Sequence, residues 1–340
     1  MDLTKWNIIK DCAVIKKQER LPVALIVDSP WIPGYTGISM LDYFSFPEKW
    51  LWANLKVIQD FPGIIFLPGF WVEFGMATEP SGFGCKVRFY ENTLPQIYPA
   101  IKSAGEISSL DIPNPRADGL MPLALNVYKH INHMVNEMGY TIKVVASRGP
   151  YTIAAHIMGL TNFLVGLKID PENTHKLLKL ICKFIIIWLE AQMDVLKDVE
   201  GIMVLDDVAG FISREDFIEF ALPYFKQVFS SFPGMVKIYH NDTDNPVSYE
   251  FLEELGVNIF NFTHLQNIAN VRKMAGSKVC LMGNVPPLQV LAEGSQDLVR
   301  EKALECIRDN KDIPGFILSA GGGVSPGTPG ENIRALCSVV

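Results

Sequence analysis

The strand-like stretch 235–242 ends in three side chains that can take part in chemistry, His240, Asn241 and Asp242. Successive side chains of a strand point to opposite faces, so we expect His240 and Asp242 to project on the same side. An imidazole and a carboxylate placed together bind divalent metals or act as an acid–base pair. A second interpretation stays open: Asp242 bonds a turn amide, His240 bonds a backbone carbonyl, and the motif only closes the strand.

Other apolar segments also end in carboxylates, an imidazole or an amide. In chain order these residues are Asp28, Asp206, Asp207, His264 and Asn284. Imidazoles and carboxylates suit a divalent metal such as Zn²⁺, which in catalytic sites uses three protein ligands and keeps one position open. Structural roles remain the alternative, because the aspartates can cap a loop and His264 can close a strand.

Eight continuous apolar runs alternate with helical segments and predict the strands that must position these residues. The runs are 21–27, 63–67, 141–146, 201–205, 235–240, 257–261, 278–282 and 315–318. Continuous apolar runs are typical of parallel strands buried on both faces. We therefore predict an α/β fold, a (β/α)8 TIM barrel, whose strand carboxyl ends carry the active site. An open doubly wound sheet is the alternative, but no G-x-G-x-x-G follows the first run.

Segments outside the barrel strands complete the predicted architecture. We expect an N-terminal helix over 5–17 and an inserted loop or hairpin after the second strand, with an alternating piece at 86–89. No internal repeat or low-complexity tract divides the sequence. We therefore expect a single domain over 1–340.

Aromatic and charged residues in the same loops predict a substrate pocket. Trp31, Trp71 and Tyr151 follow strands, where they are expected to form a flat apolar wall for an aromatic substrate or else to belong to the core. Arg148 can bind a carboxylate or form a structural ion pair, and the residues favour neither interpretation.

Composition and charge exclude several classes of partner. The chain of 340 residues has a net charge of −7 and no run of Lys or Arg, so we expect no binding to nucleic acid or to anionic membranes. The most apolar stretch, 177–189, is too short to cross a bilayer and contains Lys179 and Lys183. The first residues lack a signal-peptide pattern, so we expect a cytoplasmic location with reduced cysteines.

Three motifs together resemble the uroporphyrinogen decarboxylase superfamily. They are Gly149-Pro150-Tyr151-Thr152, Gly283-Asn284-Val285-Pro286-Pro287 and Thr328-Pro329-Gly330-Glu331-Asn332-Ile333, and the resemblance covers about 21–340. This superfamily also contains corrinoid-dependent methyltransferases. The loops at 28–34 and 68–76, with Glu79-Pro80-Ser81, look like the branch of methyltransferase I enzymes that demethylate aryl methyl ethers.

The resemblance implies a metal site and a set of functional residues. Zinc-binding members that methylate coenzyme M hold the metal by an H-x-C motif and a Cys in the Gly-rich loop. Here His240 matches the first ligand, Asp242 replaces the first Cys, Gly322 takes the place of the second, and His264 matches a further ligand. We therefore expect zinc on His240, Asp242 and His264. His240, Asp206 and Asp207 are the predicted catalytic residues, with either aspartate as a further ligand or an orienting group.

The remaining residues of the predicted site are assigned to substrate binding. They are Asp28, Trp31, Trp71, Glu79, Arg148, Tyr151 and Asn284. Replacement of the thiolates by a carboxylate favours a harder site that acts on oxygen. The arginine-rich porphyrin-binding signature of the decarboxylases is missing, so we do not expect porphyrinogen decarboxylation.

The expected reaction moves a methyl group from a small methoxylated aromatic compound to the Co(I) of a separate corrinoid protein, with a metal or an acid activating the ether oxygen. Three alternatives remain: a metal-free lyase of the decarboxylase type that uses Asp28, Arg148 and Tyr151, methyl transfer with another methylated substrate such as a thiol, and a non-catalytic barrel that binds an aromatic ligand. A homodimer is compatible with the sequence.

Overall fold

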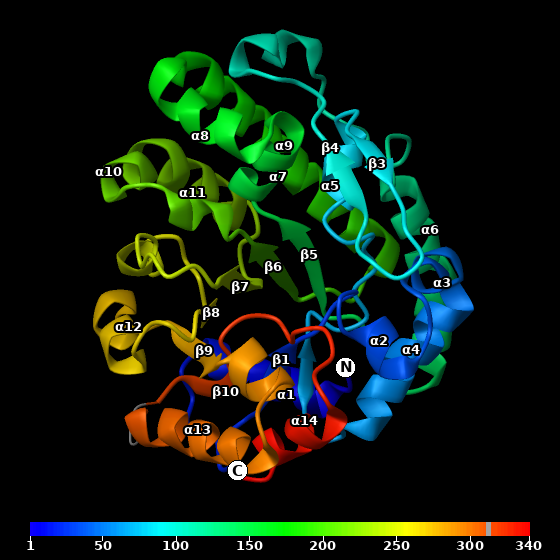
Figure 1. Ribbon diagram of the computed structural model, residues 1–340, viewed down its shortest axis with the longest axis vertical. Helices are drawn as coiled ribbons and strands as arrows, with labels where there is room; N and C mark the ends of the chain where they lie inside the picture. The colour runs from blue at the N-terminus through cyan, green and yellow to red at the C-terminus, as the bar shows by residue number, and fades with distance from the viewer. Residues whose placement is uncertain (311–313) are drawn as a thin grey trace.

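The eight predicted apolar runs form the strands of a parallel barrel in the computed structural model, which describes residues 1–310 and 314–340. The barrel strands are β1 (Ala24–Ile26), β2 (Ile65–Leu67), β5 (Val144–Arg148), β6 (Gly201–Leu205), β7 (Val236–Asn241), β8 (Ile259–Phe262), β9 (Cys280–Val285) and β10 (Phe316–Ala320). Figure 1 shows the helices arranged around these strands. The predicted (β/α)8 fold is therefore confirmed.

The strands follow the chain order around the barrel. Ladders join β5 through β10 in one parallel sheet and join β1 to β2 in a second. The pairs Val23–Leu318 and Ile26–Gly323 connect β1 to β10. Within residues 1–310 and 314–340 no ladder joins β2 to β5, and this seam is the edge of both sheets.

The barrel is filled by inward-facing apolar side chains and closed at its amino-terminal end by α1 (Leu3–Ala13). Trp6 of α1 is fully buried, and its Nε1 donates to Oε2 of Glu200 at 2.8 Å, immediately before β6. Met203 of β6 and Met282 of β9 belong to the same buried cluster. The predicted N-terminal helix is confirmed, although it ends earlier than residue 17.

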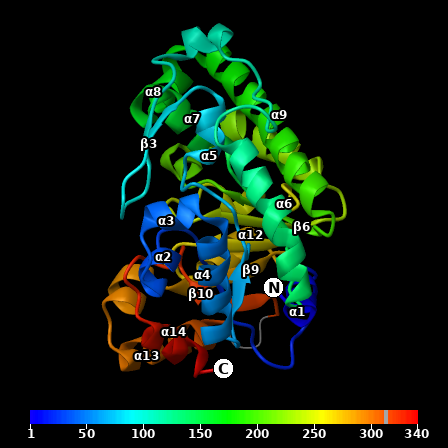
Figure 2. The same ribbon diagram turned by 90° about the vertical axis from the view of Figure 1, so that its right-hand side faces the viewer.

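A larger apolar layer lies between the strands and the outer helices, since each helix buries one face. The long helices α6 and α9 run along one side of the molecule (Figure 2). The helices are α2 (Ile32–Thr36), α3 (Met40–Ser45), α4 (Pro47–Asp60), α5 (Thr78–Gly82), α6 (Met121–Glu137), α7 (Pro150–Met158), α8 (Leu160–Ile169), α9 (Pro171–Leu196), α10 (Arg214–Asp216), α11 (Leu222–Ser230), α12 (Ile268–Ala275), α13 (Gln296–Asp309) and α14 (Gly330–Cys337).

Shorter elements occupy the loops that follow the barrel strands. The predicted insertion after β2 contains an antiparallel hairpin of β3 (Lys86–Arg88) and β4 (Gln96–Tyr98). The 3-10 segments are η1 (Ala104–Ser109), η2 (Val208–Phe211) and η4 (Tyr249–Phe251), and the π segments are η3 (Phe217–Ala221) and η5 (Pro287–Ala292). In the described chain, no single helix is long and apolar enough to cross a membrane; α7 and α8 meet that test only as a pair, bent by 104°.

Candidate metal centre and adjoining cavity

Three side chains that can bind a metal meet at the carboxyl ends of β6 and β7. Asp207, His240 and Asp242 each offer one ligand atom, and these atoms lie within 4.8 Å of one another. Nε2 of His240 is 3.5 Å from Oδ1 of Asp207, and that oxygen also accepts a hydrogen bond from the backbone N–H of Asp242 at 3.0 Å. We call these three residues the metal group, and their imidazole and carboxylate donors fit a divalent cation.

The orientation of His240 is fixed by a buried amide on the next strand. Nδ1 of His240 lies 2.7 Å from Oδ1 of Asn261, whose Nδ2 donates to the carbonyls of Met282 and Ala320 at 2.8 and 3.1 Å. Carbonyl oxygens only accept, so Nδ2 must face them and Oδ1 must face the imidazole. Nδ1 of His240 therefore carries the proton, and in the neutral ring Nε2 presents its lone pair to the metal group.

The electrostatics of the metal group favour the protonated forms of His240 and Asp242. Burial lowers the pKa of His240, but the carboxylates of Asp207 and Asp242 outweigh burial and raise it overall. Burial also raises the pKa of Asp242 to about 6, with a further contribution from the charge of Asp207. Carboxylates this close repel one another, and a divalent cation would relieve that repulsion.

The lack of a side chain at Gly322 leaves room for the Asp242 carboxylate. Gly322 has φ of +133°, and a Cβ on this residue would lie 2.6 Å from Oδ2 of Asp242. The position that the resemblance aligned with a cysteine ligand is therefore filled by the side chain of Asp242. His264, the third expected ligand, lies beside the same loop, because a Cβ on Gly321 would lie 2.4 Å from its backbone nitrogen.

His264 is not part of the metal group, and Asp207 is the third member of that group. Its Nδ1 is buried and has no hydrogen-bond partner among the residues that the structure describes, and burial lowers the pKa of the ring. His264 thus lies at the same end of the barrel as His240, as expected, but the ligand set that the geometry favours differs by one residue from the predicted set.

Asp206 faces away from the metal group and fixes α7. Its fully buried carboxylate accepts hydrogen bonds from the N–H groups of Tyr151 and Thr152 at 2.8 and 3.0 Å and from Oγ1 of Thr152 at 2.9 Å. A Cβ on Gly149 would lie 2.4 Å from Oδ2 of Asp206, so glycine permits this contact. The oxygens of Asp206 thus cap the first turn of α7, and the catalytic role expected of this residue stays a prediction.

A buried arginine and two glutamates lie beside the metal group. Nη2 of Arg148 is 2.6 Å from Oε2 of Glu73, and Oε1 of Glu73 accepts from the N–H and hydroxyl of Ser29 at 3.1 and 2.8 Å. Oε1 of Glu79 accepts from the backbone N–H of Arg148 at 3.0 Å, and the guanidinium carbon is 4.6 Å from the centroid of the Trp71 ring. Arg148 is therefore held from several sides. Glu73 was not predicted as a site residue.

Negative charge is in excess in this part of the barrel. Five carboxylates are present, those of Asp28, Glu73, Glu79, Asp207 and Asp242, and they face one guanidinium and one imidazole. Burial and the charge of Glu73 raise the pKa of Asp28 to about 7, against the opposite effects of Arg148 and His240. A divalent cation on the metal group and a proton on Asp28 would bring the site closer to neutrality.

A cavity of about 410 Å³ adjoins the metal group through Asp207. Its wall is largely aliphatic, with Met76, Ile97, Leu160 and Val208, and Arg148, Thr152 and His156 supply further polar groups. No Phe, Tyr or Trp side chain is among the described residues that line this cavity. Two aromatic residues that were predicted to bind substrate are buried outside this cavity.

Those two residues, Trp31 and Tyr151, belong to the core. Nε1 of Trp31 donates to the carbonyl of Thr328 at 2.9 Å, and its ring stacks on Tyr35 at 4.8 Å. Tyr151 is fully buried and packs edge-on against Phe163. Asn284 also has a structural position, since its Nδ2 donates to the carbonyls of Thr263 and Gln266 at 3.0 and 2.8 Å.

His156 is a cavity residue that the sequence interpretation missed, because its helical context indicated a surface or core position. Thr152, Ala155, His156 and Gly159 line the cavity and are spaced i, i+3, i+4 and i+7. That spacing places them on one face of a helix. The signal available in the sequence was the spacing of Thr152 and His156, which puts two polar side chains on one face of the helix that directly follows a barrel strand.

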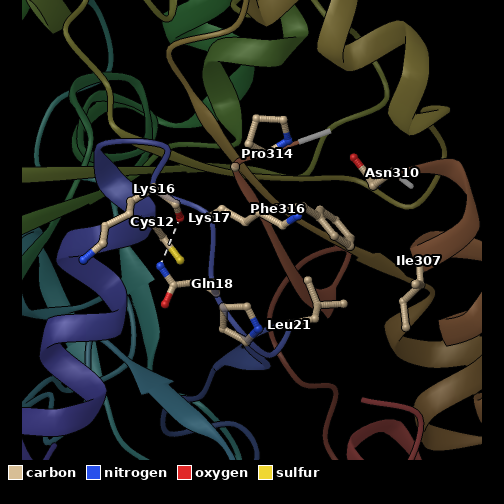
Figure 3. Close-up of a pocket in the computed structure, with 11 residues that line it drawn as sticks. Cys12, Lys16, Lys17, Gln18, Leu21, Ile307, Asn310, Pro314 and Phe316 are labelled. Atoms are coloured by element: carbon tan, nitrogen blue, oxygen red, sulfur yellow. Dashed lines mark hydrogen bonds between the residues drawn. The ribbon is translucent and has the colours of Figure 1, made fainter. Parts of the chain in front are cut away.

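A second pocket lies at the opposite end of the barrel. Figure 3 shows Cys12 and Lys16 near the end of α1, facing Asn310 and Phe316 across a cavity of about 290 Å³. Nε2 of Gln18 donates to the carbonyl of Lys16 at 3.0 Å there. Active sites of these barrels form at the carboxyl ends of the strands, so the cavity beside the metal group is the candidate site.

Comparison with known proteins places this geometry in context. A family model described as "Uroporphyrinogen decarboxylase (URO-D)" matches residues 16–340. Uroporphyrinogen decarboxylase of Anaeromyxobacter sp. is 23% identical over 319 residues, covering 92% of this chain and 85% of the relative.

Two further similarities are to methyltransferases of Methanosarcina mazei. The methylated-thiol–coenzyme M methyltransferase is 24% identical over 264 residues, covering 77% of this chain and 69% of that protein. A solved structure of a methyltransferase from the same organism superposes with a TM-score of 0.83 at 18% identity, covering 97% of this chain and 96% of that one. The superposition supports the barrel fold.

Proposed function

The chain belongs to the uroporphyrinogen decarboxylase (URO-D) family, and from this premise we propose that it is a methyltransferase that removes the methyl group of an aryl methyl ether and transfers it to the Co(I) of a corrinoid protein. The observation that carries this proposal is the metal group beside an aliphatic cavity at the carboxyl ends of the strands. The similarity to the thiol–coenzyme M methyltransferase supports the transfer of a methyl group.

The donor atoms favour an ether oxygen over a thiol. Asp207, His240 and Asp242 would hold the metal, and their oxygen and nitrogen donors make a harder site than thiolates would. We propose zinc as the metal. Bound zinc would supply Lewis acidity toward the ether oxygen, where negative charge develops as the bond to carbon breaks.

The residues around the metal group have separable tasks in the proposed reaction. The aliphatic wall holds the aromatic ring and excludes water, and Asn261 keeps Nε2 of His240 directed at the metal group. The C–O bond breaks with its electron pair on the oxygen, and the methyl group passes to Co(I), which becomes methyl-Co(III). Asp28 is the candidate acid that gives a proton to the departing phenolate, because it follows β1 at the carboxyl end of the barrel, near His240 and Arg148, and burial raises its pKa to about 7.

Decarboxylation of a porphyrinogen is the competing function that the named relatives suggest. Uroporphyrinogen is a polycarboxylate, and its binding needs several cationic side chains. The site presents Arg148 among five carboxylates, and Arg148 is already paired with Glu73. This balance of charge disfavours a polyanionic substrate.

A rim of exposed apolar side chains supports a protein partner above the site. Phe211, Leu265 and Leu288 follow β6, β8 and β9 and are 56%, 61% and 48% exposed. Side-chain hydrogen bonds tie these loops together, from Asn245 to the carbonyl of Gly210, from Gln266 to the carbonyl of Asp244, and from Asn284 to the carbonyl of Gln266. An ordered apolar rim at the mouth suits docking of the corrinoid protein.

Single-turnover methylation tests the proposal. The zinc-loaded protein is mixed with Co(I) corrinoid protein and a panel of methoxybenzenes and methoxyphenols, and the methylcobalamin spectrum is followed. Methylation by these ethers, and its loss in His240→Ala, is the expected result. Demethylation of methylated thiols only would overturn the substrate class, and uroporphyrinogen decarboxylation without cobalamin would overturn the reaction itself.

A further inference from the structure

We infer that His156 binds a ring hydroxyl of the methyl donor, so that the enzyme selects methoxylated phenols over methoxybenzenes without a hydroxyl group. This inference rests on the proposed function, because it names the donor class for the same cavity. Its evidence is the position of His156 in the cavity, the lack of a hydrogen bond to its ring within residues 1–310 and 314–340, and the hydrogen bond that already engages the neighbouring Thr152 hydroxyl.

His156 is the polar residue of the α7 cavity face whose side chain is not already bonded. Thr152 lies one turn before it on that face, but its hydroxyl donates to Asp206 at 2.9 Å. Within residues 1–310 and 314–340 the His156 ring has no hydrogen bond, and the contact that the Cys85 thiol makes with this residue is to its backbone carbonyl. The imidazole is thus free to bond a ligand in the cavity.

The chemistry of the ring favours a hydroxyl group over an anion. Burial, together with the charge of Arg148, lowers the pKa of His156 to about 4, so the ring is neutral at pH 7. A neutral imidazole has one N–H donor and one acceptor nitrogen, and a hydroxyl can pair with either. Asp207 borders the same cavity and opposes a carboxylate on the ligand. Nη2 of Arg148 is paired with Glu73, and its Nε has no hydrogen-bond partner in the described residues.

The aliphatic wall makes this contact selective. Met76, Ile97, Leu160 and Val208 surround the space, so a donor that fills it displaces the water that otherwise bonds the imidazole. A bound ring without a hydroxyl would cut the imidazole of His156 off from water and leave it unpaired, whereas a methoxyphenol replaces the lost hydrogen bond. Sites built in this way discriminate against the analogue that lacks the polar group.

Calorimetric titration of the zinc-loaded protein without corrinoid tests the inference. The probes are methoxybenzene and the 2-, 3- and 4-methoxyphenols, and the three isomers allow for the unknown position of the hydroxyl. We expect at least one methoxyphenol to bind about tenfold more tightly than methoxybenzene. This ratio should fall to about one in His156→Leu and return in His156→Gln, which keeps a donor and an acceptor.

His133→Leu is the matched control, because His133 is an exposed histidine of α6 whose side chain is 78% accessible. A ratio near one in the wild type, or an unchanged ratio in a folded His156→Leu protein, would overturn the inference, as would no binding of any probe. The two proposals fail separately: selective binding without methyl transfer would remove the proposed function alone, and methyl transfer with equal use of all ethers would remove the role of His156 alone.

Discussion

The imidazole of His240 and the amide of Asn261 form a buried pair on neighbouring strands, with Nδ1 and Oδ1 2.7 Å apart. The pair is held from behind, because the Asn261 amide group bonds two backbone carbonyls. The metal group therefore includes an imidazole whose tautomer and direction are set before any ligand arrives.

Removal of the Asn261 side chain should weaken metal binding without removing a ligand. We expect Asn261→Ala to lower the zinc affinity by about 10–100-fold, the usual effect of losing a group that orients a metal-binding histidine. Asn332→Ala is the control, since Asn332 is also buried and also bonds two carbonyls, those of Leu291 and Gly294. Zinc titration of both variants measures the difference, and equal losses would contradict the orienting role.

A comparison of two variants separates the metal group from the ligand set expected from the sequence. Asp207→Asn removes a charged donor that lies within 4.8 Å of the others, whereas His264→Ala removes a side chain outside that group. The first should lower zinc affinity by more than about 100-fold, which exceeds the usual loss from an orienting residue, and the second should cost much less. Zinc content after dialysis is the measurement, and the reverse order would restore His264 as the third ligand.

A single methyl group on Gly322 should disturb the Asp242 carboxylate. The added Cβ would lie 2.6 Å from Oδ2 of Asp242, at a φ of +133° that side chains rarely adopt. We expect Gly322→Ala to lower zinc affinity on the order of tenfold. Gly323→Ala is the matched control, because its Cβ would meet nothing closer than 4.0 Å. If both variants bind zinc equally, the close approach of Asp242 does not matter for the metal.

Glu200 should make the stability of the fold depend on pH at the acidic end. Burial raises its pKa, but hydrogen bonds from Lys143, Trp6 and Lys10 outweigh burial and lower it to about 2. A lowered pKa adds stability that is present above the ordinary value near 4.5 and is lost as the pH falls toward 2.

Glu200→Gln should therefore cost about 1 kcal/mol or less at pH 7, because 41% of the Glu200 side chain is exposed to solvent. The difference in unfolding free energy between wild type and variant should shrink between pH 4.5 and pH 2. Urea unfolding at several pH values measures it, with Glu172→Gln controlling for the removal of one surface charge. A difference that grows as the pH falls would contradict the assignment.

An acidic residue on the apolar rim should impair transfer to the corrinoid protein alone. Leu265→Asp places a charge on a side chain that is 61% exposed at the mouth, and we expect kcat/KM for the corrinoid protein to fall about tenfold. Transfer to free cob(I)alamin should stay unchanged, because no docking is needed. Ile169→Asp, at an exposed position outside the rim, is the control, and equal effects on both acceptors would argue against docking at Leu265.

The fold was predictable because its signal is repeated. Each barrel strand is buried on both faces, so eight apolar runs mark the eight strands. The strand ends were less predictable: Arg148 and Asn284 were expected to follow their strands, but they lie within β5 and β9. A polar side chain that faces the mouth of a barrel resembles a loop residue in the sequence, and only the pairing with the next strand shows where the strand ends.

The site was predictable in outline, because parallel strands bring their carboxyl ends together. Adjacent aspartates illustrate the limit of that prediction. Asp206 and Asp207 have the same chemistry in the sequence, but one bonds the amides of α7 and the other faces His240. His156 was missed for a similar reason, since the direction of a helix face depends on packing that the sequence does not state.

Asp206 connects the strand that carries His240 to α7, through its backbone N–H on one side and its carboxylate on the other. Its backbone lies beside the metal group while its carboxylate anchors α7, the helix that carries His156. In the proposed reaction, the metal group and the residue that selects the methyl donor therefore lie on separate elements that Asp206 connects. Under the proposed function, exchanging the cavity-facing residues of α7 would change which ether is accepted and leave the residues of the metal group in place, which makes α7 the target for redesign toward new methyl donors.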